Sequence, residues 1–401
     1  MSLVADRLKA IKPSPTLAVP AKAARLRAEG KDIIGLGAGE PDFDTPQFIK
    51  DAAIAAIQKG YTKYTAAGGT PSLKKAIIAK YQRENGLEYT DRQILVSVGG
   101  KQSCFNLCLA LLNPGDEVVI PAPCWVSYPE QVRLMGAVPV IVPTSEDEGW
   151  RISPQALEQA LSPRTKAVIL CTPSNPTGAA YAEAHLGALL DVLRRHDCWI
   201  VVDEIYSELV YDGFRHVSAL TIAPDLSDRM ILVDGVSKSY AMTGWRIGWS
   251  IAPRALARAC DTVQGQSTTN PSAVAQHAAC AALTGPQDEV LAMRAAFQGR
   301  RDAMVAGLNA LPGVRCRTPE GAFYAFADCS GLYGIDFGGP ITSDADVAFF
   351  LLDRAHVAAV PGGPFAAPGY VRFSYAASEE QIRAGLARMR EAIDAARAAS
   401  R

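Results

Sequence analysis

Residues 167–203, AVILCTPSNPTGAAYAEAHLGALLDVLRRHDCWIVVD, contain the pattern that decides the fold. Two short apolar runs of strand length, 167–171 and 200–202, flank a helical stretch over 185–196. Runs rich in Val and Ile are typical of buried strands, and a strand–helix–strand order is typical of a parallel sheet. This stretch therefore predicts one unit of an α/β fold.

The same alternation continues on both sides of this unit. Between most of the predicted strands lie helical stretches, for example 102–112 and 154–161. Seven strands with intervening helices predict an α/β fold with a mostly parallel seven-stranded sheet sandwiched by helices. The other five strands are predicted at 94–98, 117–120, 138–142, 230–233 and 247–251.

The C-terminal part of the chain has a different pattern. A long amphipathic helix over 288–311 precedes two strand-like runs and a final helix, which together predict a smaller α+β domain. The N-terminal segment is rich in Gly and Pro and is expected to form an arm and a loop. We therefore predict an arm with part of the small domain over 1–46, a large ligand-binding domain over 47–287 and the small domain over 288–401.

The composition excludes several classes of protein. The 40 Lys and Arg balance the 41 Asp and Glu, so the basic excess that attracts nucleic acid or an anionic membrane is missing. No apolar run reaches 18 residues, and charges and prolines interrupt residues 1–19, so neither a transmembrane helix nor a signal peptide is predicted. The nine scattered Cys predict reduced thiols in a cytoplasmic protein. The five His show no metal-ligand spacing, so no metal is predicted.

Polar residues and glycines follow four of the predicted strands at the point where each strand ends. Ligands bind outside the carboxyl ends of the strands in an open parallel sheet, so these residues are expected to converge on one site. Taken singly, each has a plainer explanation as a turn glycine, a helix cap or a surface lysine. The residues are Gly99, Gly100 and Lys101 after the first strand, Asn175 after the fourth, Asp203 and Tyr206 after the fifth, and Ser237 and Lys238 after the sixth.

These residue types suit one cofactor. A strand–Gly-Gly–helix junction offers backbone N–H groups and a positive dipole end to a phosphate, and Arg246 could clamp the same phosphate. Lys238 is placed to form an imine with an aldehyde, and Asp203 could pair with a ring nitrogen. Pyridoxal 5′-phosphate (PLP) requires this combination. A dinucleotide site is the competing idea, but no G-x-G-x-x-G follows a predicted strand.

The segment GVSKSYAMTGWRIG (235–248) resembles the PLP-attachment signature of class I, fold type I aminotransferases. The resemblance extends over essentially the whole chain and is nearest to the bacterial aspartate aminotransferase branch, which uses a Lys near the substrate side chain. Other segments that resemble the family, in the expected order, are GAGEPDFDTP, YTKYTAAGGTPSLKKAI, VSVGGKQ, PAPCWVSYP, CTPSNPTG, VVDEIYSELVYDG and VRFSYA.

The resemblance implies a role for each catalytic and ring-binding residue. Lys238 would hold PLP as an imine and then move the substrate Cα proton. Asp203 would pair with the pyridinium nitrogen and keep the ring cationic. Asn175 and Tyr206 would hydrogen-bond the ring 3′-oxygen, and Trp125 would stack on the ring and border the substrate.

It also implies the phosphate contacts and a shared site. Arg246, Ser237 and the backbone at Gly99 and Gly100 would hold the phosphate. Tyr64 would reach it from the partner subunit, so a homodimer with shared active sites is expected.

For the substrate, the resemblance implies that Arg372 binds the α-carboxylate with a two-bond fork. The Gly39 backbone and Asn175 would contact the same carboxylate. Lys101 lies in the first turn of a predicted helix, where the dipole disfavours a cation, so it should face an anion. That anion is either the PLP phosphate or the distal carboxylate of a dicarboxylic substrate.

The expected reaction is the ping-pong transfer of the amino group of L-aspartate or glutamate to a 2-oxo acid such as 2-oxoglutarate. An aromatic or prephenate aminotransferase is an alternative, as is a PLP β-lyase or decarboxylase on the same fold. A transcription regulator that carries this fold as a sensor domain is a further class, but no basic DNA-reading segment precedes the arm. We also predict a cis Asn175–Pro176 bond, because the chain must turn sharply there.

Overall fold

A computed structural model describes residues 4–11, 18–336 and 338–399. Residues 1–3 and 12–17 lie outside the described residues. They belong to the predicted arm and to the N-terminal stretch for which no signal peptide is predicted. Among the described residues, no helix is long and apolar enough to cross a membrane, and no cluster of His, Cys, Asp or Glu could hold a metal ion.

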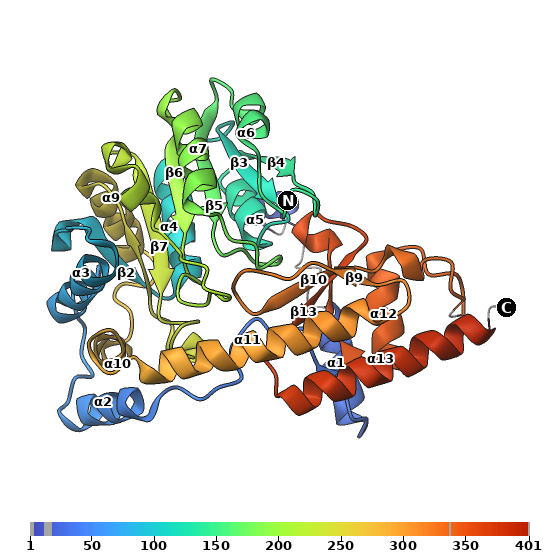
Figure 1. The fold of residues 1–401 in the computed structure, drawn as a ribbon. Helices are drawn as coiled ribbons and strands as arrows, with labels where there is room; N and C mark the ends of the chain where they lie inside the picture. The colour runs from blue at the N-terminus through green and yellow to red at the C-terminus, as the bar shows by residue number, and fades with distance from the viewer. Residues whose placement is uncertain (1–3, 12–17, 337, 400–401) are drawn as a thin grey trace.

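The central element is a seven-stranded sheet with the strand order β2-β8-β7-β6-β5-β3-β4 (Figure 1). Strand β8 pairs antiparallel with β7 and β2, and the remaining pairs in this sheet are parallel. The predicted mostly parallel sheet is therefore confirmed, and each strand covers the expected run to within a few residues. The strands are β2 Ile94–Ser97, β3 Glu117–Ala122, β4 Val138–Pro143, β5 Thr165–Cys171, β6 Trp199–Asp203, β7 Met230–Gly235 and β8 Gly248–Ile251.

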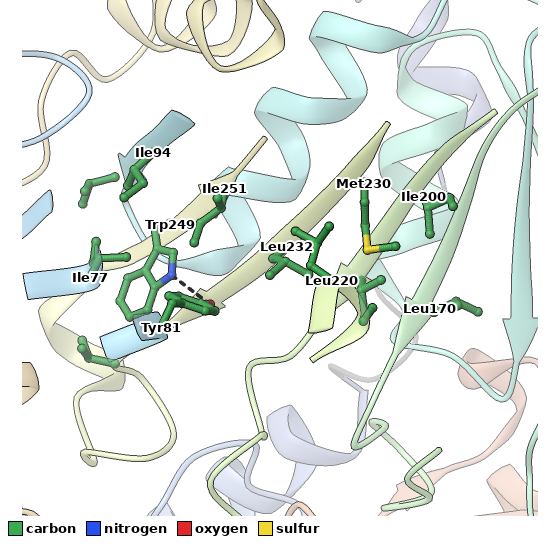
Figure 2. Packing of buried hydrophobic residues seen from close by; sticks show 14 of the residues in the cluster. Ile77, Tyr81, Ile94, Leu170, Ile200, Leu220, Met230, Leu232, Trp249 and Ile251 are labelled. Atoms are coloured by element: carbon green, nitrogen blue, oxygen red, sulfur yellow. Dashed lines mark hydrogen bonds between the residues drawn. The ribbon is translucent and has the colours of Figure 1, made fainter. Parts of the chain in front are cut away.

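Helices cover both faces of this sheet because its strands are apolar on both sides. On β7, Leu232 packs into one hydrophobic cluster, whereas Ile231 and Val233 pack into the other. Figure 2 shows the first cluster, in which Trp249 lies against Tyr81 from α3. The helices of this part are α2 Gln47–Gln58, α3 Pro71–Asn85, α4 Gly100–Leu111, α5 Ser127–Leu134, α6 Pro154–Ala160, α7 Glu183–Arg194, α8 Ala219–Ile222, α9 Arg254–Gly265 and α10 Ala273–Thr284.

A separate core forms around a four-stranded sheet with the order β12-β13-β10-β9. The long helix α11 (Asp288–Asn309) connects the two parts and ends beside this core (Figure 1). Segment β1 pairs with β11, which places residues near 35 in the smaller part. The remaining elements are β1 Ile34–Gly35, β9 Arg315–Cys316, β10 Tyr324–Asp328, β11 Val357–Ala358, β12 Val360–Pro361, β13 Tyr370–Ser374, α12 Asp344–Arg354 and α13 Glu379–Ala399.

The helix in the N-terminal segment was not anticipated from the sequence. Helix α1 (Ala18–Ala28) lies within the segment expected to be an arm and a loop. Its Val19, Ala23 and Leu26 recur at helical spacing and pack with residues of α12 in a small hydrophobic cluster. The Ala, Leu, Lys and Arg residues of this segment favour a helix, and burial against the small part stabilises it. Single-turn helices are η1 Asp6–Ala10, η3 Asp91–Gln93, η4 Pro224–Leu226, η5 Thr243–Trp245, η6 Ser330–Leu332 and η7 Gly363–Phe365.

Candidate active site

A cavity of about 1430 Å³ lies at the carboxyl ends of β5, β6 and β7. Residues from the smaller part, on β10 and β13 and in the loop after β1, complete its wall. This is the location that a parallel α/β sheet favours for a ligand. The predicted site residues that line the cavity are Gly39, Gly100, Lys101, Trp125, Asn175, Asp203, Tyr206, Ser237, Lys238, Arg246 and Arg372.

Lys238 follows the end of β7 and projects into this cavity. Its Nζ donates a hydrogen bond to the carbonyl of Gly39 at 2.5 Å. Burial, together with the nearby Arg372 cation, lowers the pKa of Lys238 to about 8. A larger fraction of this amine is therefore neutral near physiological pH than for an ordinary lysine, as a nucleophile or a base requires.

Asp203 ends β6 as a buried carboxylate, only 5% exposed. The Tyr128 hydroxyl donates to Oδ2 at 2.6 Å, and the Ile205 N–H donates to Oδ1 at 3.1 Å. Burial raises the pKa of Asp203, and the Tyr128 hydrogen bond opposes the rise. A buried carboxylate without a cationic hydrogen-bond partner among the described residues is suited to a cationic N–H of a ligand.

The Gly-Gly junction before α4 forms a second polar corner with Arg246. The guanidinium donates to the carbonyls of Thr243 at 2.9 Å and Val98 at 3.2 Å. Gly99 has a φ of +83°, and a Cβ there would lie 2.5 Å from Arg246 Nη2, so only glycine lets the guanidinium approach. Gly99 thus leaves space for the Arg246 side chain, and Gly100 lines the cavity. Ser237, 6% exposed, lies on the same wall.

Arg372, on β13, is the cation of the small part that faces the cavity. Its Nη1 donates to Asn175 Oδ1 at 2.8 Å, and its Nη2 donates to the Gly37 carbonyl at 3.0 Å. Its Nε is buried and has no hydrogen-bond partner in the described structure. Burial lowers the pKa of Arg372, and among the described residues no carboxylate offsets its charge. The predicted cis bond between Asn175 and Pro176 is confirmed.

Lys101 and Trp125 lie together at the wall of the cavity. Lys101 Nζ lies 5.1 Å from the centre of the Trp125 ring. Burial and the Arg246 cation lower the pKa of Lys101. In the described part of the chain no carboxylate pairs with Lys101, so an anion of the ligand would be its natural partner.

Tyr64 does not join this group. It lies on the loop between α2 and α3, and its side chain is 89% exposed. The prediction that it serves the site of a partner subunit stays a prediction.

Sequence reasoning missed two tyrosines of the site. Tyr128 holds Asp203, and Tyr324 on β10 places its hydroxyl 3.0 Å from that of Tyr206. Tyr128 stands three residues after Trp125, in the first turn of α5, and this spacing could have indicated it. Tyr324 had no local signal, because its apolar neighbours are typical of a buried strand.

The chain matches the aminotransferase class I and II family over residues 31–389. The chain belongs to this family. It is 51% identical over 392 residues to the aspartate/prephenate aminotransferase of Cereibacter sphaeroides, covering 97% of this chain and 98% of the relative. It is 49% identical over 393 residues to the aspartate aminotransferase of Rhizobium meliloti, covering 97% and 96%.

Solved structures of this aminotransferase family give the same result for the fold. The crystal structure of the Rhizobium meliloti aspartate aminotransferase superimposes with a TM-score of 0.95 at 48% identity and covers 98% of both chains. The Thermus thermophilus aspartate aminotransferase with maleate superimposes with a TM-score of 0.92 at 44% identity, covering 98% of this chain and all of that one. The protein is therefore a fold type I aminotransferase, as the sequence predicted.

Proposed function

We propose that this aminotransferase uses PLP to move the amino group of L-aspartate, or of glutamate, to a 2-oxo acid such as 2-oxoglutarate. The observation that carries the proposal is the buried Arg372 guanidinium, whose Nε faces no partner and whose charge no described carboxylate offsets. A buried charge of this kind is costly unless a ligand pairs with it. A substrate carboxylate supplies two oxygens that match the guanidinium fork.

The residues of the cavity fit PLP. Arg246, Ser237 and the N-terminus of α4 at Gly100 form a corner suited to a phosphate. Asp203 would hold the pyridinium N–H, and Trp125 offers a ring to stack on. When bound, PLP supplies an aldehyde for the amine and a ring that accepts electrons from the substrate Cα.

Each side chain of the cavity would have a separate role toward the substrate or the PLP ring. Arg372 and Asn175 would bind and orient the α-carboxylate, so that the Cα–H bond faces Lys238. The lowered pKa of Lys238 would leave its amine able to take a proton from the Cα of the donor amino acid in one half-reaction. In the other half-reaction Lys238 would give a proton to the Cα that derives from the accepting 2-oxo acid. Tyr206 would donate a hydrogen bond to the 3′-oxygen of the ring, and Asp203 would keep the ring nitrogen protonated.

Lys101 would bind the distal carboxylate of a dicarboxylic substrate. Arg246 and the backbone amides already serve the phosphate corner, which leaves the cation of Lys101 for a second anion. The structure of the related Thermus thermophilus enzyme contains maleate, a dicarboxylate, and this supports the same substrate class here.

A homodimer with shared sites completes the proposal. Ile54, Ile57, Tyr61 and Tyr64 are exposed apolar side chains on or just after α2. Such a cluster favours a protein contact, and a second copy of the chain would cover it and bring Tyr64 to the phosphate corner. The two separate cores support the proposed division into an arm with part of the small domain (1–46), a large domain (47–287) and a small domain (288–401).

Prephenate is a second candidate amino acceptor. Relatives from Cereibacter sphaeroides and Nitrosomonas europaea, 51% and 50% identical, are named aspartate/prephenate aminotransferases. The cavity, at about 1430 Å³, is large enough for a ring-bearing dicarboxylate in place of 2-oxoglutarate.

The test is a steady-state assay of the PLP-loaded protein. Aspartate with 2-oxoglutarate should give oxaloacetate and glutamate with parallel-line, ping-pong kinetics. Aspartate or glutamate with prephenate would show the second activity. Pyruvate formed from a β-substituted alanine without any 2-oxo acid would identify a β-lyase and overturn the proposal.

A further inference from the structure

Tyr324 lies between Arg372 and Tyr206, two residues of the site with different proposed roles. It is on β10, fully buried, and its ring lies under the Arg372 guanidinium at 4.4 Å from ring centre to Cζ. Its hydroxyl lies 3.0 Å from the hydroxyl of Tyr206. One side chain therefore contacts both the substrate-carboxylate residue and the residue assigned to the ring oxygen of PLP.

The position of Tyr324 is fixed by its surroundings. In the sheet, Tyr324 pairs with Ser374, two residues beyond Arg372 on β13. The ring of Phe323 lies 4.7 Å away, and the Tyr206 ring meets it edge-on at 5.9 Å. A ring held on these sides keeps its hydroxyl aimed at Tyr206.

The charges around the pair decide which hydroxyl donates. Arg372 on β13 faces both phenols, Lys238 after β7 lies over the Tyr206 ring at 5.8 Å, and Cys171 at the end of β5 is neutral because burial raises its pKa. Burial raises the pKa of both hydroxyls, and the Arg372 cation opposes the rise at each. The Arg372 guanidinium lies 4.4 Å from the centre of the Tyr324 ring, whereas Lys238, over the Tyr206 ring, lies 5.8 Å from its centre, so the nearer cation acts on Tyr324. Tyr324 is therefore the more acidic phenol and the better donor.

We propose that Tyr324 is a positioning residue that couples the carboxylate site at Arg372 to the hydroxyl of Tyr206. Tyr324 donates its proton to the Tyr206 oxygen, and the Tyr206 proton then points into the cavity. Hydrogen bonds in a chain strengthen one another, so Tyr206 becomes a stronger donor to a ring oxygen. A carboxylate on Arg372 neutralises the cation above Tyr324, weakens this donation and transmits binding to Tyr206.

The inference rests on the proposed function, because its readout is the visible absorption of bound PLP. A stronger hydrogen bond donated to the ring oxygen makes that oxygen a weaker acceptor for the neighbouring imine proton, and so lowers the pKa of the imine. Removing the Tyr324 hydroxyl should therefore raise the pH midpoint of the absorption change, in the same direction as removing the Tyr206 hydroxyl. The shift expected from the loss of cooperativity is about 0.2–0.7 pH unit.

The experiment compares the PLP-loaded wild type with Tyr324→Phe, Tyr206→Phe and the double variant. Tyr324→Phe should shift the midpoint upward and leave maleate affinity within about threefold, because the ring under Arg372 stays. In the Tyr206→Phe background the same substitution should cause no further shift. Maleate should also shift the midpoint less in Tyr324→Phe than in the wild type.

Two controls keep the outcomes distinct. Tyr324→Met, which keeps an apolar but smaller side chain without ring or hydroxyl, should show the same midpoint shift and weaker maleate binding, and it replaces Tyr324→Phe if that variant does not fold. An unchanged midpoint in Tyr324→Phe, or an equal shift with Tyr206 absent, overturns the coupling. A wild-type protein that takes up no PLP refutes the proposed function instead.

Discussion

Lys101→Ala is the substitution that tests substrate choice most directly. Lys101 contacts the Trp125 ring, lines the cavity and pairs with no carboxylate among the described residues. If its cation binds the distal carboxylate of the substrate, the variant should lose activity selectively toward aspartate and glutamate. Phenylalanine and alanine lack that carboxylate and should be nearly unaffected.

The magnitude follows from the position of the side chain. Two unit charges 4 Å apart attract by about 1 kcal/mol in water and by about 4 kcal/mol at an effective dielectric constant of 20. Lys101 lies at the wall of the cavity, between these limits, and a charge-assisted hydrogen bond contributes about 1.5–3 kcal/mol. The selective loss in kcat/KM for dicarboxylic substrates should therefore be roughly 10- to 150-fold.

The assay measures kcat/KM for the half-reaction with each of four amino acids, together with PLP affinity. The ratio of aspartate to alanine removes any loss that all substrates share, such as the lost contact with Trp125. Lys101→Arg should keep most of the selectivity, because it retains the charge. Lys75→Ala, at an exposed lysine on α3 that does not line the cavity, is the matched control and should change nothing.

An equal loss for all four amino acids, accompanied by weaker PLP binding, would refute this reasoning. Lys101 would then serve the phosphate together with Arg246, and the substrate class would need another determinant.

Three further predictions concern the cofactor and the assembly. After borohydride reduction of the PLP-loaded protein, a peptide map should show the pyridoxyl group on Lys238, and a label on another lysine contradicts the assignment. The Lys238→Ala variant should lose nearly all transamination. The pKa of Lys238 is lowered to about 8, and its neutral amine is the nucleophile. The rate of PLP uptake by the cofactor-free protein should therefore rise up to tenfold per pH unit below pH 8 and level off above it. Stopped-flow absorbance measures this rate. Mixing Tyr64→Phe with Arg372→Ala subunits should restore some wild-type sites, because in a mixed dimer both defects fall in one site and the other site is intact. An active monomer at high dilution, seen by sedimentation, argues against the shared site.

The sequence determined the large sheet because the information for each strand is local. Runs of Val and Ile such as those in β5 and β6 are apolar on both faces, and only a strand buried between two layers of helices accepts that pattern. The position of the site followed from the same pattern, because parallel strands end at one edge. Lys238, Asp203 and Asn175 were therefore predictable as members of one site from the sequence alone.

The contacts that finish the site were decided by the tertiary structure alone. Tyr128 and Asp203 are 75 residues apart, Tyr206 and Tyr324 are 118 apart, and Asn175 and Arg372 are 197 apart. The position of helix α1 was likewise decided by the packing of its apolar side against α12. Periodicity along the chain reports which face of an element is buried, but not which distant element lies against that face. The partner of a buried hydroxyl or guanidinium is set when the two cores pack together, and that packing depends on the whole chain.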